Sequence, residues 1–282
     1  MPNCRTGVVF ALISCCAEGS DASLTSSKWA DPAPASNYDA EGMLHGQGKR
    51  HAAVSVMAAA VPAFLKSGDI YNFGVYTGGG LRAIVREFYT QQNLTFNHIW
   101  GFDSFVGLPD SNVALHSPTN ARHGQWKAGD LNAADQLAKV LGTDAYNFKI
   151  LQRHIIKHIG TEQVTLVKGF FNESLPRLSL ELKIRMQPAL LVDIDCDIYE
   201  GTVEGLEWLI ANHLLVRGSF VYYDDWQVAG EGEVKAHGEV TKKHGLQWED
   251  MRLSDACLVR GTTCFRQRLF RLQGRASNLD KA

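Results

Sequence analysis

Long hydrophobic runs and an excess of either sign of charge are both missing from this sequence of 282 residues. The longest uncharged apolar stretches, at 7–17 and 52–65, fall short of the ~18 residues that span a bilayer. Lys and Arg number 28 and Asp and Glu number 30, so the chain has no overall basic field to hold nucleic acid or anionic lipid. The sequence therefore predicts no membrane span and no nucleic-acid partner.

Cysteine is scarce as well, with six residues at positions 4, 15, 16, 196, 257 and 264. They form no C-x-x-C pair and their spacing is irregular, which predicts neither a zinc site nor a disulfide framework. Apolar residues make up 45% of the chain and charged residues 21%, as in ordinary globular proteins. The length suits one large domain or two small ones.

The N-terminal region differs in composition from the rest. Residues 7–17 form an apolar run behind Arg5 and resemble a short secretory signal. Residues 18–48 are rich in Ser, Ala, Pro, Gly and Asp without periodicity. We assign residues 1–48 to a poorly ordered leader or linker, 49–275 to one domain and 276–282 to a tail. The predicted location is the cytoplasm, with secretion or an organelle as the alternative because of the apolar run.

Strands and helices alternate through the domain. Helical patterns lie at 50–66, 81–91 and 200–214, and a long polar and helical region lies at 110–160. Strands are predicted at 70–76, 98–102, 164–167, 189–194, 220–223, 246–251 and 263–269, the last two without a clear helix between them. This alternation predicts an α/β fold: a seven-stranded, mostly parallel sheet with an antiparallel C-terminal strand at 263–269 and helices on both faces.

Gly74 lies at the end of the first predicted strand, and Gly78, Gly79 and Gly80 follow it and lead directly into a helix. Glycine lets a cofactor approach the backbone, and a helix N-terminus offers free N–H groups. The next strand ends at Asp103, where a carboxylate can accept hydrogen bonds from both ribose hydroxyls of a nucleoside. The pair indicates an adenosine-type cofactor. The glycines alone also fit a tight turn or a dinucleotide-binding pattern.

Acidic residues gather at the ends of two later strands. Asp193, Asp195 and Asp197 alternate at the end of one, and Asp224 and Asp225 end the next. Close like charges are costly unless something positive lies among them, and Mg²⁺ prefers oxygen ligands of this kind. The pattern predicts a metal site. The alternative is that Asp197 or Asp225 caps the helix that follows it.

Five ordered motifs between about 70 and 240 resemble the macrocin O-methyltransferase family. They are Gly74-Val75-Tyr76-x-Gly78-Gly79, Trp100-Gly101-Phe102-Asp103-Ser104-Phe105-x-Gly107-Leu108-Pro109, Gly169-Phe170-Phe171-x-x-Ser174-Leu175-Pro176, Ile194-Asp195-Cys196-Asp197-Ile198-Tyr199-Glu200-x-Thr202 and Tyr223-Asp224-Asp225-Trp226. The resemblance implies a Rossmann-like class I methyltransferase fold, S-adenosylmethionine and Mg²⁺ as cofactors, and a hydroxyl of a sugar or other small natural product as methyl acceptor.

The resemblance also assigns roles to residues. The implied cofactor-binding residues are Gly74, Tyr76, Gly78, Gly79, Asp103 and Ser104, with Asp103 on the ribose. The implied metal ligands are Asp195, Asp224 and Asp225, and the implied general base is Asp197. The sequence departs from the family at Asn72, where the family has Glu, and at Thr77, where it has a basic residue. Both departures raise the prospect of weakened cofactor binding.

Two other functions are weighed against an O-methyltransferase. A nicotinamide-dependent oxidoreductase could use the same glycines and Asp103, but it leaves the aspartates of 195–225 without a role. A non-catalytic binding protein on a methyltransferase scaffold would fit the departures at Asn72 and Thr77. The polar stretch 111–130 is long for a connector, and we expect either a lid over the acceptor or a surface excursion there.

Overall fold

The computed structural model describes residues 40–65, 67–109, 127–226, 232–259 and 266–276, with side chains from residue 49 onward. The strands are β1 (Ser67–Phe73), β2 (Thr95–Asp103), β3 (Val164–Lys168), β4 (Ala189–Ile194), β5 (Phe220–Tyr223), β6 (Leu246–Asp250) and β7 (Arg268–Arg275). The α-helices are α1 (Ala40–Ala60), α2 (Gly79–Phe88), α3 (Ala133–Leu141), α4 (Phe148–Ile159), α5 (Phe171–Ser174), α6 (Leu180–Arg185), α7 (Tyr199–Ala211), α8 (Gly232–His244) and α9 (Leu253–Val259). Short 3₁₀ turns lie at Ala63–Leu65 and Gly142–Tyr146.

All seven strands form one sheet in the order β3-β2-β1-β4-β5-β7-β6. Neighbours from β3 to β5 pair in parallel, and β7 pairs antiparallel with both β5 and β6. The predicted mostly parallel sheet with an antiparallel C-terminal strand is therefore confirmed. The chain moves outward from β1 to β3 and then returns to β4, so strand order reverses between β1 and β4. In such sheets ligands bind beyond the carboxyl ends of the strands at this reversal.

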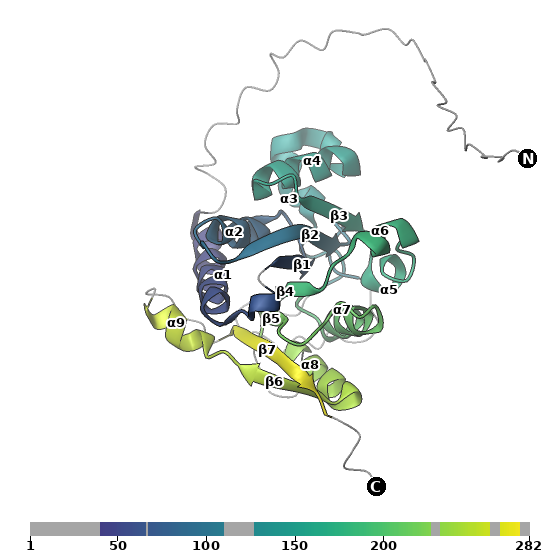
Figure 1. Ribbon diagram of the computed structural model, residues 1–282. Helices are drawn as coiled ribbons and strands as arrows, with labels where there is room; N and C mark the ends of the chain where they lie inside the picture. The colour runs from purple at the N-terminus through teal and green to yellow at the C-terminus, as the bar shows by residue number, and fades with distance from the viewer. Residues whose placement is uncertain (1–39, 66, 110–126, 227–231, 260–265, 277–282) are drawn as a thin grey trace, which may run out of the picture. The chain divides into compact units, whose positions relative to one another are not determined.

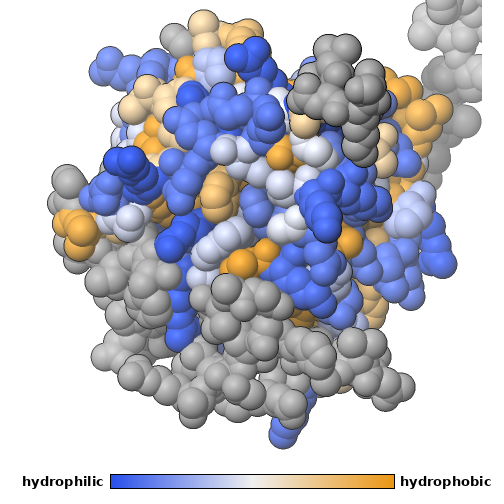
Figure 2. Space-filling view, turned by 90° about the horizontal axis from the view of Figure 1, so that it is seen from below, coloured by the Kyte–Doolittle hydropathy of each residue, from blue (hydrophilic) through white to orange (hydrophobic). Residues whose placement is uncertain are grey.

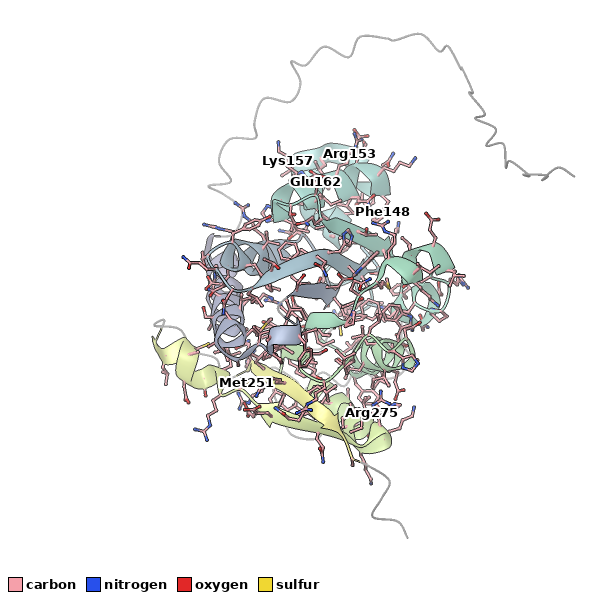
Figure 3. All side chains as sticks on the ribbon, in the orientation of Figure 1. Phe148, Arg153, Lys157, Glu162, Met251 and Arg275 are labelled. Carbon is pink, nitrogen blue, oxygen red and sulfur yellow. The ribbon has the colours of Figure 1, made fainter. Side chains whose placement is uncertain are left out.

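Helices cover both faces of the sheet (Figure 1). On one side α1 packs on α2 and α9, and on the other α7 packs on α8 and α5. In Figure 3, Phe148 and Lys157 belong to α4, which lies above β3 in this view, whereas Met251 follows β6 and Arg275 ends β7. Because the central strands are covered twice, all six residues of β4 are buried, which explains the run of apolar residues, Ala189–Val192, that predicted this strand.

The first helix differs from its prediction at both ends. It spans Ala40–Ala60 rather than 50–66, so it begins inside the segment that we assigned to the leader. It stops two residues before Pro62, because proline has no N–H to donate and disfavours helical backbone in the residue before it. The N-terminal segment 1–39, including the signal-like run, lies outside the described residues.

The C-terminal part corrects the prediction in two ways. The antiparallel strand β7 runs over Arg268–Arg275 rather than 263–269, and the helix α9 lies between β6 and β7. Residues 263–265 lie outside the described part of the chain. In α9, buried Cys257 is disulfide-bonded, a pairing that the irregular cysteine spacing did not reveal.

On the face shown in Figure 2, hydrophilic residues predominate and hydrophobic ones occur in small separate groups. Within the described ranges, no helix has both the length and the apolar character that a membrane crossing requires.

Candidate active site

A cavity of about 280 Å³ opens at the carboxyl ends of β1, β2 and β4. It lies where strand order reverses, as expected for a ligand site in this kind of sheet. Six of the residues singled out from the sequence line it: Gly74, Tyr76, Asp103, Ser104, Asp195 and Asp197. Side chains from α5 and α7 complete its wall, among them Phe171 and Glu204.

Gly74 lies where the ends of β1 and β4 come too close together for a side chain to fit. Its φ is +100°, and a Cβ there would lie 1.9 Å from the carbonyl oxygen of Asp195. The backbones of β1 and β4 are joined here, since the N–H of Asp195 donates to the carbonyl of Phe73 at 2.9 Å. The glycine thus makes room for the chain's own backbone, and by keeping β1 and β4 together it shapes the cavity.

Gly78 and Gly79 start the helix α2 and lie outside the cavity lining. A Cβ on Gly78 would come within 3.0 Å of Ile155 and Ile159 of α4, whereas Gly79 faces open space. The structure therefore gives Gly78 a packing role between α2 and α4. A cofactor role for either glycine stays a prediction.

Asp103 holds the turn that follows β1. Its Oδ2 accepts hydrogen bonds from the N–H groups of Val75 and Tyr76, each at 2.8 Å, and its Oδ1 accepts one from Phe105 at 2.6 Å. Burial raises the pKa of Asp103, although these three N–H groups lower it. Because Asp103 also lines the cavity, its carboxylate can fix the turn and still face a ligand hydroxyl. Ser104 supports the next turn by donating to the carbonyl of Gly107 at 2.6 Å.

Residues on both sides of the predicted lid or surface excursion lie at the cavity. Leu108 donates its N–H to the carbonyl of Asp130 at 2.8 Å, and Gly129 donates to the carbonyl of Leu108 at 2.9 Å. Leu108 and Leu131 both line the cavity. Residues 110–126 lie outside the described part of the chain.

The structure brings together the three predicted metal ligands. One carboxylate oxygen from each of Asp195, Asp224 and Asp225 lies within 4.8 Å of the others. This convergence follows from the pairing of β4 with β5 in parallel, which ends both strands at the same edge. Asp195 also lines the cavity, so this oxygen cluster borders the space beside Asp103.

Asp197 lies next to that cluster in an unusual backbone conformation. Its φ is +63°, which is uncommon for a residue other than glycine and is typical of strained functional positions. Burial and the adjacent Asp225 carboxylate, with which it shares a hydrogen bond, raise the pKa of Asp197 well above its usual range. Asp197 thus lies within hydrogen-bond reach of the acidic cluster, and its role as the general base stays a prediction.

Glu233 was missed by the sequence analysis. It lies at the start of α8, is 1% exposed, and its Oε2 accepts a hydrogen bond from the N–H of Asp225 at 3.0 Å. Its Oε1 has no hydrogen-bond partner among the described residues. Burial, then the charge of Asp225, raises the pKa of Glu233 well above the usual value. Glu233 adds another acidic group directly behind the cluster.

Arg50 of α1 was missed too, and its guanidinium lies among the aspartates. Nη2 donates to Asp195 Oδ2 at 2.7 Å, Nη1 to Asp224 Oδ1 at 3.2 Å, and Nε to Asp193 Oδ2 at 3.3 Å. Burial opposes its charge, but the three carboxylates outweigh burial and raise the pKa of Arg50. The requirement for a positive group among the carboxylates, stated from the sequence, could have directed attention to this arginine.

Asn72 does not contact the cavity. It is 1% exposed and donates its side-chain N–H to Asp193 Oδ2 at 2.9 Å, across the pairing of β1 with β4. Its Oδ1 has no partner among the described residues. Having Asn72 in place of the family's Glu therefore removes a negative charge behind the strand ends. It does not change a residue that lines the cavity.

The sheet order, the antiparallel β7 and a cavity bordered by a glycine turn and Asp103 define the Rossmann-like class I methyltransferase fold. Within this class the chain belongs to the macrocin-O-methyltransferase (TylF) family, whose model matches residues 33–258. The family predicted from the five motifs is thereby confirmed.

Individual relatives are more distant. The chain is 28% identical over 182 residues to the 8-demethyl-8-(2,3-dimethoxy-alpha-L-rhamnosyl)-tetracenomycin-C 4'-O-methyltransferase of Streptomyces olivaceus, a match over 62% of this chain and 57% of that protein, so it spans little more than half of its relative. Among solved structures it is similar to the O-methyltransferase NovP, with 22% identity, a TM-score of 0.47 and coverage of 82% and 79% of the two chains. The calicheamicin methyltransferase CalS11 gives 23% identity, a TM-score of 0.47 and coverage of 82% and 78%.

Proposed function

We propose that this protein is an S-adenosylmethionine-dependent O-methyltransferase that methylates a hydroxyl of a sugar or other small natural product. We further propose that a divalent cation, Mg²⁺, is held by Asp195, Asp224 and Asp225. The observation that carries the proposal is that one cavity is bordered both by Asp103, suited to a ribose, and by the oxygen cluster that includes Asp195. Cofactor and acceptor could therefore meet at one place.

The donor set fits a hard cation. Carboxylate oxygens are the ligands that Mg²⁺ prefers, and it commonly keeps several waters besides one or two carboxylates. Three carboxylates, Asp193, Asp195 and Asp224, contact the guanidinium of Arg50, and Asp197, Asp225 and Glu233 lie near them. Protons or a bound cation could balance the negative charge that the Arg50 guanidinium does not offset.

The chain's own residues supply orientation and a proton acceptor. Methyl transfer forms an O–CH₃ bond on the acceptor as the S–CH₃ bond of the sulfonium breaks, so the two atoms must be held in line. Asp103 would fix the ribose, and Asp197 would accept the hydroxyl proton as the new bond forms. The products are a methyl ether and S-adenosylhomocysteine. A bound divalent cation would lower the pKa of a hydroxyl in contact with it.

The acceptor class is supported by the relative from Streptomyces olivaceus, which by its name methylates the 4'-hydroxyl of a rhamnosyl natural product. Rhamnosyl natural products are therefore the acceptors to try first.

The test begins with calorimetry of the whole chain against S-adenosylhomocysteine, NAD and Mg²⁺. We expect binding of the first and third but not of NAD; binding of NAD alone would refute the methyltransferase and favour an oxidoreductase. Methyl transfer from labelled S-adenosylmethionine is then measured on a panel of glycosides. Binding of S-adenosylhomocysteine with no transfer to any member would favour the non-catalytic alternative.

Asp197→Asn provides the sharper test of the mechanism. It keeps the shape of the side chain but removes the proton acceptor, so transfer should slow by roughly 10²- to 10⁴-fold while binding of cofactor and cation persists. The matched control is Asp255→Asn on α9, an exposed carboxylate outside the cavity lining. A normal rate in Asp197→Asn would exclude this residue as the base.

A further inference from the structure

We propose that Arg50 is a positioning residue for the cation site. Its guanidinium takes one oxygen of Asp195 and one of Asp224, and so leaves a second oxygen of each carboxylate for a cation shared with Asp225. This inference rests on the proposed function, because it presumes that the three aspartates bind a cation.

Arg50 binds one oxygen of Asp195 and one oxygen of Asp224. Asp195 Oδ2 and Asp224 Oδ1 are the oxygens that Arg50 binds, and Tyr222 also donates its hydroxyl to Asp224 Oδ1 at 2.7 Å. The other oxygen of Asp195 and of Asp224 receives no hydrogen bond from the residues that the structure describes. Arg50 therefore limits how each of these two carboxylates can turn. One oxygen of each lies within 4.8 Å of an oxygen of Asp225.

The guanidinium is itself held from several sides. It is buried, with the side chain 4% exposed, and lies 5.2 Å from the centre of the Tyr222 ring. Its Nε also binds the fully buried Asp193 of β4. A Cβ on Gly80 of α2 would lie 3.0 Å from the guanidinium carbon, so α2 packs closely against the guanidinium at this glycine.

The helix that carries Arg50 is fixed to α2. His51 Nδ1 lies 2.8 Å from Glu87 Oε2, and Ser55 donates its hydroxyl to Glu87 Oε1 at 2.7 Å. Glu87 is 5% exposed, so this anchor is almost buried. Arg50 thus enters the site from a rigid support, as a positioning group requires.

Geometry and charge can be separated by substitution. Lysine keeps the positive charge, but its single ammonium cannot reproduce a planar fork that contacts three carboxylates. If Arg50 acted only as a counter-charge, Arg50→Lys would bind the cation like wild type. If it positions the ligands, Arg50→Lys should bind the cation more weakly, by roughly tenfold or more, as for other groups that orient metal ligands.

The experiment measures Mn²⁺ binding by electron paramagnetic resonance on the full chain without cofactor. S-adenosylhomocysteine affinity is measured in parallel by calorimetry. We expect Arg50→Lys to lose Mn²⁺ affinity while its affinity for S-adenosylhomocysteine stays near that of wild type, because Arg50 does not line the cavity. The matched control is Arg86→Lys on α2, which is exposed and should change neither affinity.

A folding defect is the one complication, because Arg50 compensates the buried charge of Asp193. The second variant is therefore Arg50→Lys combined with Asp193→Asn, compared with Asp193→Asn alone. The double variant should again bind Mn²⁺ more weakly than its own parent. Equal affinities in this pair, or in wild type and Arg50→Lys, would overturn the proposal, as would tighter binding, which would show that Arg50 competes with the cation.

Failure of the proposed function would look different. Wild type that binds no Mn²⁺ would refute the cation site itself and the role of Arg50 with it. Wild type and variants that bind Mn²⁺ as expected, but methylate no acceptor, would refute the proposed activity and leave the positioning role of Arg50 supported.

Discussion

Replacing Asp103 by asparagine should weaken both the fold and cofactor binding. The carboxylate accepts three N–H groups, two through Oδ2 and one, from Phe105, through Oδ1. Asparagine offers a single oxygen, so an amide that keeps the bonds to Val75 and Tyr76 turns its NH₂ toward the N–H of Phe105. Two donors would then face each other where a 2.6 Å hydrogen bond existed.

The magnitude follows from these contacts. Losing a hydrogen bond to a charged group costs about 1.5–3 kcal/mol, and the two bonds that remain become weaker because their acceptor is neutral. Asparagine avoids burying a charge, which offsets part of this loss. We expect the free energy of unfolding to fall by about 2 kcal/mol. Loss of one charge-assisted bond to the ribose should raise the Kd for S-adenosylhomocysteine by about 10- to 150-fold.

Urea unfolding followed by circular dichroism measures the first effect, and calorimetry with S-adenosylhomocysteine measures the second. Asp69→Asn is the matched control. Asp69 is fully buried near the other end of the sheet, where its Oδ2 accepts hydrogen bonds from Trp100 Nε1 at 2.7 Å and the N–H of Gln187 at 2.8 Å. This control should lose stability but not cofactor affinity. A folded Asp103→Asn that binds S-adenosylhomocysteine like wild type would refute the role of Asp103.

Gly74→Ala should lower the melting temperature strongly, because its Cβ would lie 1.9 Å from the Asp195 carbonyl oxygen. Gly238→Ala on α8 should not, because a Cβ there meets open space. Equal melting temperatures of the two variants would contradict the close packing at Gly74. Mg²⁺ at about 100 times its Kd should raise the free energy of unfolding by about 2.7 kcal/mol, and melting that ignores both Mg²⁺ and a chelator would refute the cation site. Burial lowers the pKa of His237 from 6.5 to about 4 in the folded protein. As the pH falls from 6.5 to about 4, His237 is protonated in the unfolded chain but not in the folded one, so the free energy of unfolding decreases. Between pH 7.5 and 4.5 wild type should therefore lose about 2 kcal/mol more than His237→Phe in chemical unfolding, and equal losses would show that His237 is not the cause.

The sequence was most informative where local pattern and burial agree. The strand β4 was predicted with its observed bounds because every residue in it is buried, so five of its six residues are apolar and only Asp193 is not. The strand β7 was placed too early because only Leu269 and Leu272 are buried among its residues. Arginines fill several of the other positions, so the strand has no clear apolar pattern. The helix α9 is seven residues long, too short for periodicity to reveal.

The site shows the same division. Asp195, Asp224 and Asp225 could be expected to converge, because neighbouring parallel strands end at one edge. Arg50 and Glu233 come from α1 and α8, and no local pattern states how a helix is turned against the sheet. Both residues occupy the acidic site only through tertiary packing. Tertiary packing therefore places the Arg50 guanidinium among the aspartates, which the sequence did not predict.

The two hydrogen bonds that join Leu108 to Gly129 and Asp130 have a consequence for how this protein can diversify. These bonds hold the chain together on both sides of the intervening stretch, and they lie outside the strands, so the number of residues between them can change without altering the sheet. Doubling the length of such a loop costs only about 0.6 kcal/mol in closure entropy. Since Leu108 and Leu131 line the cavity, a change in the length of chain between them would act next to the cavity and leave the strand pairing in place.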